Sequence, residues 1–166
     1  MRPEPERAET VAFRVDGASA AQIAAHLLRC DAQFVTALSG RVDILAYAQK
    51  IADLSVRFEA WSGDTLIGLV AAYVNSGEKS AYVTSVSVLA DWLRRGIGIR
   101  LMRDCVAHAR LLGLRDVRLE VHANNRSAVG LYEKLGFAAG ETHAESIHMR
   151  LDLQAAEERS PLCRNR

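Results

Sequence analysis

Cysteine is scarce in this sequence, and no two cysteines have the spacing of a metal or redox site. The chain has three, Cys30, Cys105 and Cys163, an odd number with no Cys-x-x-Cys motif. Cys30 and Cys105 lie in apolar helical patterns and are expected to be small buried residues, whereas Cys163 lies in a polar tail. The pattern argues against a disulfide-stabilised secreted domain and favours a reducing compartment.

Long apolar runs and a strong net charge are also lacking. The longest apolar stretch, 66–74, is interrupted by Gly68 and is far shorter than the roughly 20 residues of a membrane helix. Residues 1–10 are charged and contain no apolar core of a signal peptide. A formal net charge of +1 argues against a dedicated nucleic-acid or polybasic membrane binder. We therefore expect a cytoplasmic protein without nucleic-acid or membrane partners.

The length and composition are those of one globular domain. The chain has 166 residues, 49% hydrophobic and 25% charged, close to the usual prior of about 150 residues per domain. Residues 1–10 and 154–166 are polar and unpatterned, so both are predicted to be flexible termini. The segment between them, 11–153, contains no linker or repeat and is predicted to form a single domain.

Hydrophobic periodicity predicts a mixed α/β fold. Tight turns at 62–64 and 75–78 join three predicted strands into an antiparallel meander. The strand–helix–strand–helix–strand order after residue 80 predicts a βαβ unit on the same central sheet. The predicted strands are 11–15, 56–61, 65–74, 80–88, 117–122 and 147–153, and the predicted helices are 19–30, 42–52, 96–112 and 127–135.

The longest predicted helix opens with the segment 94–98, Arg-Arg-Gly-Ile-Gly, directly after a buried strand. Glycines let the backbone pass close to a ligand, and the free amides at a helix N-terminus bind anions. A dinucleotide fingerprint would need a third glycine at Leu101, and the chain lacks the Gly-Lys-Ser/Thr triplet of a P-loop. The segment therefore predicts a phosphorylated ligand held in another way.

Residues 119–137, LEVHANNRSAVGLYEKLGF, follow this helix start at the distance that one helix and one strand require. Together the two segments resemble the GNAT superfamily of acetyl-CoA-dependent N-acyltransferases. The family pattern is Q/R-x-x-G-x-G/A at a helix start, then N-x-x-A-x-x-L-Y-E-x-x-G-F. The second part is complete from Asn125 to Phe137, whereas Leu93 replaces the Gln or Arg of the first. The resemblance implies one GNAT-like domain around a splayed mixed sheet.

The resemblance also implies a binding mode for acetyl-CoA as co-substrate, with no metal. Two splayed strands leave unpaired amides that the pantetheine arm can satisfy as an added strand. In this family the pyrophosphate is held mainly by backbone amides, so Leu93 is expected to weaken one side-chain contact only. The residues implied in cofactor binding are Val86, Ser87, Val88 and Asn125 for the arm, and Arg94, Arg95, Gly96, Ile97, Gly98 and Ile99 for the pyrophosphate.

Direct acyl transfer to an amine needs a proton donor for the departing thiolate and a base for the amine. The resemblance places Tyr132 near the sulfur as the donor, and the Val88 amide is the candidate donor to the oxyanion. Glu120 is the preferred base because its spacing before Tyr132 resembles the ribosomal-protein N-terminal acetyltransferases. In a strand, Glu120 and His122 face the side opposite to their neighbours in sequence.

Three alternatives to the Glu120 base stay open. Glu120 would be structural if it paired with an arginine such as Arg118 or Arg126. His122, on the same face of the strand, is a second candidate base. A water relay without a dedicated side chain is the third.

The expected function is an N-acetyltransferase that acts on a primary amine. Segments 38–52 and 72–86 loosely resemble GNAT members of amino-sugar metabolism, which favours a small-molecule acceptor. The alternatives are a protein N-terminal or lysine acetyltransferase and, in another class, a non-catalytic acyl-CoA-binding regulatory module. Dimers are common in the family, so the resemblance also allows a homodimer.

Overall fold

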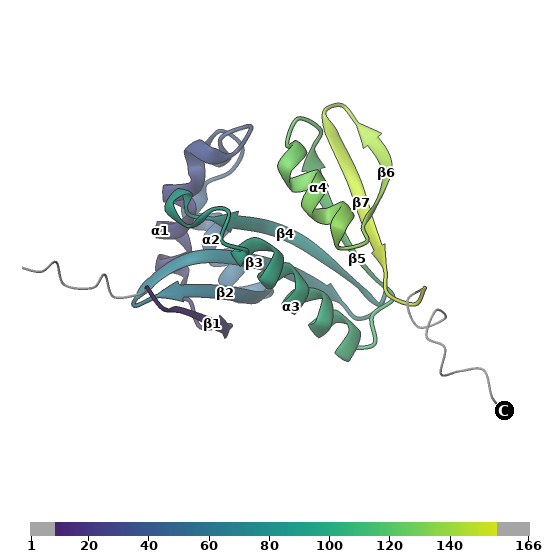
Figure 1. Ribbon diagram of the computed structural model, residues 1–166, viewed down its shortest axis with the longest axis horizontal. Coiled ribbons are helices and arrows are strands. Elements are labelled where there is room, and N and C mark those ends of the chain that lie inside the picture. Colours follow the sequence, from purple (N-terminus) through teal and green to yellow (C-terminus); the bar gives the residue numbers. More distant parts are fainter. Residues whose placement is uncertain (1–8, 156–166) are drawn as a thin grey trace, which may run out of the picture.

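A computed structural model describes residues 9–155, which form a single seven-stranded sheet with helices on both faces (Figure 1). The strand order is β1-β2-β3-β4-β5-β7-β6, and every neighbouring pair is antiparallel except β4 and β5. Most of the expected termini, 1–10 and 154–166, lies outside the described residues. The strands are β1 (Val11–Val15), β2 (Val56–Ser62), β3 (Thr65–Asn75), β4 (Ser80–Val88), β5 (Asp116–His122), β6 (Ala138–His143) and β7 (Ser146–Asp152).

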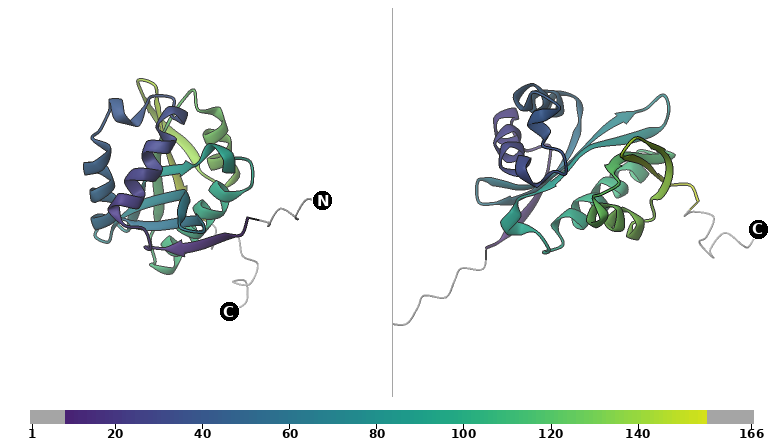
Figure 2. Two further views of the ribbon diagram at one scale, coloured as in Figure 1. Left: turned by 90° about the vertical axis from the view of Figure 1, so that its left-hand side faces the viewer. Right: turned by 90° about the horizontal axis from the view of Figure 1, so that it is seen from above.

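Four α-helices cover the sheet in two layers (Figure 2). On one face α1 and α2 pack on the β2–β4 part, and on the other face α3 packs on the same strands while α4 lies over β5 and β7. The helices are α1 (Ala20–Cys30), α2 (Ile44–Leu54), α3 (Ile97–Leu111) and α4 (Arg126–Lys134), with short 3-10 helices η1 (Asp31–Gln33), η2 (Leu38–Gly40) and η3 (Ala90–Trp92).

Side-chain caps set where the first two helices begin. Ser19 and Gln22 form a capping box, in which Ser19 Oγ accepts from the Gln22 amide (3.2 Å) and Gln22 Oε1 accepts from the Ser19 amide (2.9 Å). Asp43 Oδ1 accepts from the Ala46 amide (3.0 Å) and caps α2. The predicted start of that helix at residue 42 is therefore wrong by two residues, because Asp43 binds helix amides from a non-helical conformation.

Each helical layer encloses its own apolar core. The α3 and α4 side buries Leu101, Met102 and Cys105 against the sheet, while the α1 and α2 side buries Leu27 and Ile51. The α1–α2 layer does not extend across β5, β7 and β6, where the side chains on that face are exposed. Cys30 and Cys105 are buried free thiols, which confirms that expectation.

A buried carboxylate ties three adjacent strands, β4, β5 and β7, together at one end. Asp116, at the start of β5, accepts hydrogen bonds from Ser80 Oγ of β4 (2.6 Å), Arg118 Nε (3.0 Å) and Arg150 Nε of β7 (2.9 Å). Burial alone would raise the pKa of Asp116, but these donors outweigh it and lower that pKa. The charged carboxylate thus holds β4 beside β5 where the two strands begin.

The mixed sheet, the antiparallel meander and the β4–α3–β5 unit are confirmed. The sequence reading missed β6, because all six of its residues are exposed and their sequence, AAGETH, has no apolar alternation. Within residues 9–155, no helix combines the length and apolar character that a membrane crossing requires.

Candidate functional site

The parallel pairing of β4 with β5 ends long before the strands do. Ser80 to Val83 pair with Asp116 to Leu119, and beyond these four pairs β4 is bonded only to β3, and β5 only to β7. A β-bulge marks the point of separation, since Ser85 and Val83 oppose consecutive residues of β3 and leave Thr84 unopposed. Bulges bend a strand and end pairing. The sheet therefore has an opening between β4 and β5, in its interior.

Tyr47 of α2 stabilises the bulge from the side. Its hydroxyl lies 2.8 Å from the Thr84 carbonyl oxygen and 2.8 Å from Thr84 Oγ1. The carbonyl can only accept, so the phenol donates to it and accepts from the threonine hydroxyl. Tyr47 thus satisfies the carbonyl that the bulge removes from the sheet ladder.

The ladder between β3 and β4 shows which backbone groups face the opening. The Leu89 amide donates to the Ile67 carbonyl (2.9 Å). Because bonded and non-bonded pairs alternate in an antiparallel ladder, Ser87 bonds to β3 whereas Val86 and Val88 direct their amides and carbonyls away from it. Val86 therefore carries a backbone donor and an acceptor into the opening. Val88 contributes its amide, since the Gln33 side-chain amide, once oriented to bond both neighbours, donates to the Val88 carbonyl (3.2 Å).

Ser87 has a different place from the one expected. Its backbone belongs to the β3 ladder, and its hydroxyl lies 2.8 Å from Nε2 of His26, on α1. His26 Nδ1 lies 2.9 Å from the Leu66 carbonyl, so Nδ1 donates and Nε2 accepts from Ser87. Burial lowers the pKa of His26 to about 4, which keeps the ring neutral at pH 7. Ser87 anchors β4 to α1 and does not face the opening.

The start of α3 lies beside the far end of β4. Gly96 is its N-cap with φ +76°, and Arg94 also has a positive φ of +61°. The Arg100 amide donates to the Gly96 carbonyl (3.1 Å), but none of the amides from residue 94 to 99 has an acceptor in the described chain. Six free amides and the positive end of a 15-residue helix form an anion site.

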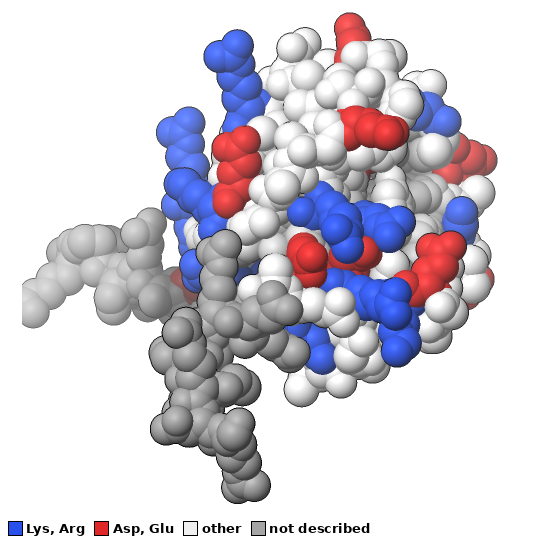
Figure 3. Space-filling model, turned by 90° about the vertical axis from the view of Figure 1, so that its right-hand side faces the viewer, with Lys and Arg blue, Asp and Glu red and all other residues white. Residues whose placement is uncertain are grey.

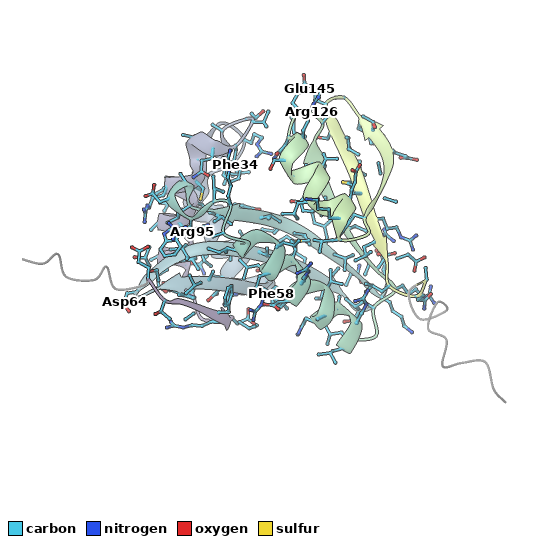
Figure 4. The ribbon with its side chains drawn as sticks, in the orientation of Figure 1. Phe34, Phe58, Asp64, Arg95, Arg126 and Glu145 are labelled. Atoms are coloured by element: carbon cyan, nitrogen blue, oxygen red, sulfur yellow. The ribbon has the colours of Figure 1, made fainter. Side chains whose placement is uncertain are left out.

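The arginines of this loop are held at its edge. The Arg95 guanidinium lies over the Trp92 ring, 4.6 Å from its centroid, and 3.8 Å from Glu9 Oε2. Figure 4 shows the labelled Arg95 beside the turn that leads into α3. Arg94 is exposed and has no ion pair with a described side chain. The groups available for the expected pyrophosphate contact are therefore the backbone amides, and the two arginine side chains lie nearby.

A cavity of about 390 Å³ occupies the opening between the strands. Leu119 and Val121 point into the core beneath α4, so Glu120 and His122 point to the opposite face of the sheet. Tyr132 of α4 reaches the cavity from the α4 face, and Glu120 reaches it from the α1–α2 face. The two predicted catalytic side chains thus line one cavity from opposite sides.

Tyr132 is held as a neutral phenol. It is buried and packs against Phe137, with ring centroids 5.9 Å apart, and its hydroxyl has no hydrogen-bond partner among the described residues. Burial raises the pKa of Tyr132 to about 12. Its hydroxyl is therefore protonated at neutral pH and free to donate. Asn125 also lines the cavity, but its Oδ1 caps α4 through the Ala128 amide (3.2 Å), which leaves only the Nδ2 group for a ligand.

The structural alternatives for Glu120 are not realised. Arg118 bonds to Asp116, and neither Arg118 nor Arg126 forms an ion pair with Glu120. Glu120 is exposed and has no hydrogen bond or ion pair within residues 9–155. It is therefore available to a ligand.

His122 is already engaged on both ring nitrogens. Its Nδ1 accepts from the Asn124 amide (3.1 Å), so the proton lies on Nε2, which donates to Glu145 Oε2 (3.0 Å). This bond joins the end of β5 to the β6–β7 turn. The arrangement makes His122 a poorer base than Glu120, because the lone pair on its Nδ1 already accepts the Asn124 amide.

The sequence did not predict that the α1–α2 connection forms one wall of the cavity. Phe34 lies on this wall, across the opening from Arg126 and Glu145 (Figure 4). Tyr82 of β4 also lines the cavity. The lining residues before residue 43 carry no motif, because this part of the chain reaches the site only through the tertiary packing of α1 and α2. The additional lining residues include Phe34, Val35, Arg41, Val42, Tyr47 and Tyr82.

The surface charge is mixed, and the described residues offer no metal centre. On the face drawn in Figure 3, Lys and Arg side chains are interspersed with Asp and Glu. Within residues 9–155, no group of three or more His, Cys, Asp and Glu side chains is placed to hold a metal ion.

Comparison with known proteins agrees with this geometry. The sequence pattern of the Acetyltransferase (GNAT) family matches residues 23–137. The chain belongs to this family. It is 39% identical over 103 residues to the mycothiol acetyltransferase of Corynebacterium glutamicum, an alignment that covers 60% of this chain and 34% of that protein. The chain thus matches about a third of the length of this curated relative.

Solved structures of the family share the fold. The ribosomal-protein-S18-alanine N-acetyltransferase of Escherichia coli superimposes with a TM-score of 0.70 at 19% identity, over 87% of this chain and 94% of that one. The PaiA N-acetyltransferase of Thermoplasma acidophilum, crystallised with coenzyme A, gives a TM-score of 0.65 at 15% identity, over 85% and 99% of the two chains. The mixed α/β architecture is therefore that of a GNAT domain.

If the free amides before α3 bind coenzyme A, a substitution at Gly96 should weaken binding, and Gly113 provides the matched control. Gly96 and Gly113 flank the two ends of α3, both have positive φ (+76° and +69°), and neither has a neighbour that a Cβ would meet. We expect Gly96→Ala and Gly113→Ala each to destabilise the fold by about 1 kcal/mol, because a side chain disfavours this conformation. Only Gly96→Ala should weaken coenzyme A binding, by about tenfold, as the amides lose their geometry.

The measurement is calorimetric titration with coenzyme A, together with urea denaturation of both variants. Equal affinities for Gly96→Ala and Gly113→Ala would show that the α3 loop does not hold the ligand.

Proposed function

We propose that this protein is an acetyl-CoA-dependent N-acetyltransferase that transfers the acetyl group directly to a primary amine. The observation that carries the proposal is the cavity between the parted strands β4 and β5, which Tyr132 and Glu120 line from opposite faces. Family membership supports the reaction class. A regulatory module that only bound acyl-CoA would need the anion site but neither of these two side chains.

The backbone groups of the site match the chemistry of acetyl-CoA. The free amides from residue 94 to 99 suit a pyrophosphate, and the outward-facing backbone of Val86 and Val88 suits the amide-bearing pantetheine arm as an added strand. Gly98 leaves room between Val88 and Leu131, since a Cβ there would have each at 3.8 Å. When bound, acetyl-CoA supplies an activated acetyl thioester. Asn125 Nδ2 is the side-chain donor proposed for the arm.

Val88 is the proposed donor to the carbonyl oxygen of the thioester. With the Gln33 amide oriented to satisfy both neighbours, Gln33 donates to the Val88 carbonyl (3.2 Å) and accepts from the Ala90 amide (3.1 Å). The carbonyl of Val88 is then occupied, and its amide stays free on the edge of the opening. A fixed amide at this point stabilises the negative charge that develops on the oxygen.

Proton transfers on the two faces of the sheet complete the reaction. The C–N bond forms as the C–S bond breaks, so the amine must lose a proton and the sulfur must gain one. Glu120, on the α1–α2 face, accepts the proton of the amine directly or through one water. Tyr132, on the α4 face, donates to the departing thiolate, whose parent thiol has a pKa of about 8.5. The side-chain arrangement keeps the two proton transfers apart.

We propose a small-molecule primary amine as the acceptor, with an amino sugar as one candidate. The cavity volume of about 390 Å³ lies in the range of about 300–1,000 Å³ typical of small-molecule sites. A peptide N-terminus is the second candidate, because the spacing of Glu120, Asn125 and Tyr132 resembles the enzymes that acetylate ribosomal proteins. Thiol release from acetyl-CoA with amino sugars, nucleotide-linked amino sugars, polyamines and short peptides distinguishes the two classes.

Removal of the Tyr132 hydroxyl should slow the chemical step. We expect Tyr132→Phe to lower kcat by about tenfold to a hundredfold, because the thiolate loses its proton donor, with little change in the affinity for acetyl-CoA. Tyr73→Phe is the matched control, since Tyr73 lies on β3 and does not line the cavity. Steady-state thiol release measures both variants, and unchanged turnover of Tyr132→Phe would remove the acid role from this residue.

Neutralising Glu120 tests the base separately. Glu120→Gln should lower kcat by about a hundredfold at neutral pH, because the isosteric amide cannot accept the proton of the amine. Glu78→Gln removes the same charge from the turn before β4, at the opposite end of the strand from the opening, and should keep full activity. If Glu120→Gln turned over at the normal rate, a water relay without this carboxylate would have to activate the amine.

A further inference from the structure

The cavity carries two opposite and unpaired charges. Among the described residues that line it, Arg41 is the one arginine or lysine and Glu120 is the one carboxylate. Arg41 follows η2 on the α1–α2 connection, and Glu120 lies on β5, so they belong to opposite walls. Within residues 9–155, neither side chain has an ion pair or a side-chain hydrogen bond.

Three other charged groups near the opening have partners within residues 9–155. Arg118 and Arg150 both bond to Asp116, and Glu145 accepts from His122. Arg41 and Glu120 are left without such partners, as is Arg126 at the start of α4, but Arg126 does not line the cavity. Because Arg41 is exposed and has no ion pair within residues 9–155, its guanidinium donors are available for a ligand.

Two tyrosines of the cavity wall, Tyr47 and Tyr82, each lie near one of these charges. Burial raises the pKa of Tyr47, and Arg41 is one of the groups that counteract this rise. Burial also raises the pKa of Tyr82, and Glu120 raises it further. Arg41 therefore acts on the Tyr47 side of the cavity and Glu120 on the Tyr82 side. The cavity thus has a positive charge near Tyr47 and a negative charge near Tyr82.

We infer that the acceptor carries an anionic group, a carboxylate or a phosphate, in addition to its amine, and that Arg41 binds this group. The inference rests on the proposed acetyltransferase function and names the substrate class of the same site. The amine lies at Glu120 and the anion at Arg41, so the acceptor is oriented with its nucleophile toward the thioester.

The side chains around Arg41 fit this class of ligand. The planar guanidinium fork matches carboxylate and phosphate oxygens, to which it donates two parallel hydrogen bonds. The Thr36 hydroxyl lines the same cavity and can donate to a further oxygen, while Val35 and Val42 form apolar walls. A polyamine is disfavoured, because a second ammonium group would lie beside the arginine with like charge.

Matched acceptor pairs test the inference. The pairs are glucosamine 6-phosphate with glucosamine, and alanine with alaninamide, with spermidine as the polycationic probe. We expect at least one anionic member to have a kcat/KM about tenfold above that of its neutral partner, since a charge-assisted bond to Arg41 contributes this much. Arg41→Gln should reduce the ratio to less than about threefold by raising KM for the anionic member, and Arg41→Lys should restore part of it.

Arg110→Gln is the control for loss of charge. Arg110 is exposed in the last turn of α3 and does not line the cavity, so this variant should keep the full preference for anionic acceptors. The KM for acetyl-CoA should be the same in all four proteins, because Arg41 acts on the acceptor.

Calorimetry with acetyl-CoA separates failure of the inference from failure of the proposed function. Absence of acetyl-CoA binding would overturn the proposed function itself. If acetyl-CoA binds, the inference is overturned by equal use of charged and neutral partners, by turnover confined to spermidine, by a preference that survives Arg41→Gln, or by inactivity of all five acceptors.

Discussion

The early end of the pairing between β4 and β5 is the constraint on which the rest of the site depends. Asp116 holds the two strands together at one end through Ser80, while the bulge at Thr84 turns β4 away after only four residue pairs. Both strands then carry unpaired backbone groups along an opening in the interior of the sheet. Because buried backbone groups need partners, an amide-bearing ligand fits there as a missing strand.

The two helical layers give the opening two chemically different sides. The α3–α4 layer contributes the free amides before α3 and the neutral hydroxyl of Tyr132. The α1–α2 layer leaves β5 uncovered and thereby exposes Glu120 on the other face. A reaction that removes a proton from an incoming amine and delivers one to a departing thiolate needs this division. The fold separates the two groups because alternate side chains of β5 point to opposite faces, which places Glu120 on one face, and because α4 carries Tyr132 on the other.

The sequence predicted those parts of the site that depend on local chemistry. The bounds of β4 agree with the prediction, because β-branched alternation is a property of neighbouring residues. The predicted start of α3 at Gly96 is one residue early, since Gly96 is the N-cap and the helix begins at Ile97. The bulge at Thr84 and the cavity position of Arg41 were not predicted, since both depend on segments far apart in the chain. Ser87 was expected among the ligand contacts, but its backbone bonds to β3. Which residues of β4 bond to β3 depends on the register between the two strands, which the turn sets, and not on the identity of residue 87.

Hydrogen exchange at the β4 amides tests the central claim most directly. Saturating acetyl-CoA should slow exchange at Val86 and Val88, because the pantetheine arm takes up the Val86 amide and the thioester carbonyl takes up the Val88 amide. The Ser87 amide, already bonded to β3, should change far less and serves as the internal control. This alternating pattern would place the ligand along the edge of β4. Bound acetyl-CoA that left exchange at Val86 and Val88 unchanged would contradict the account.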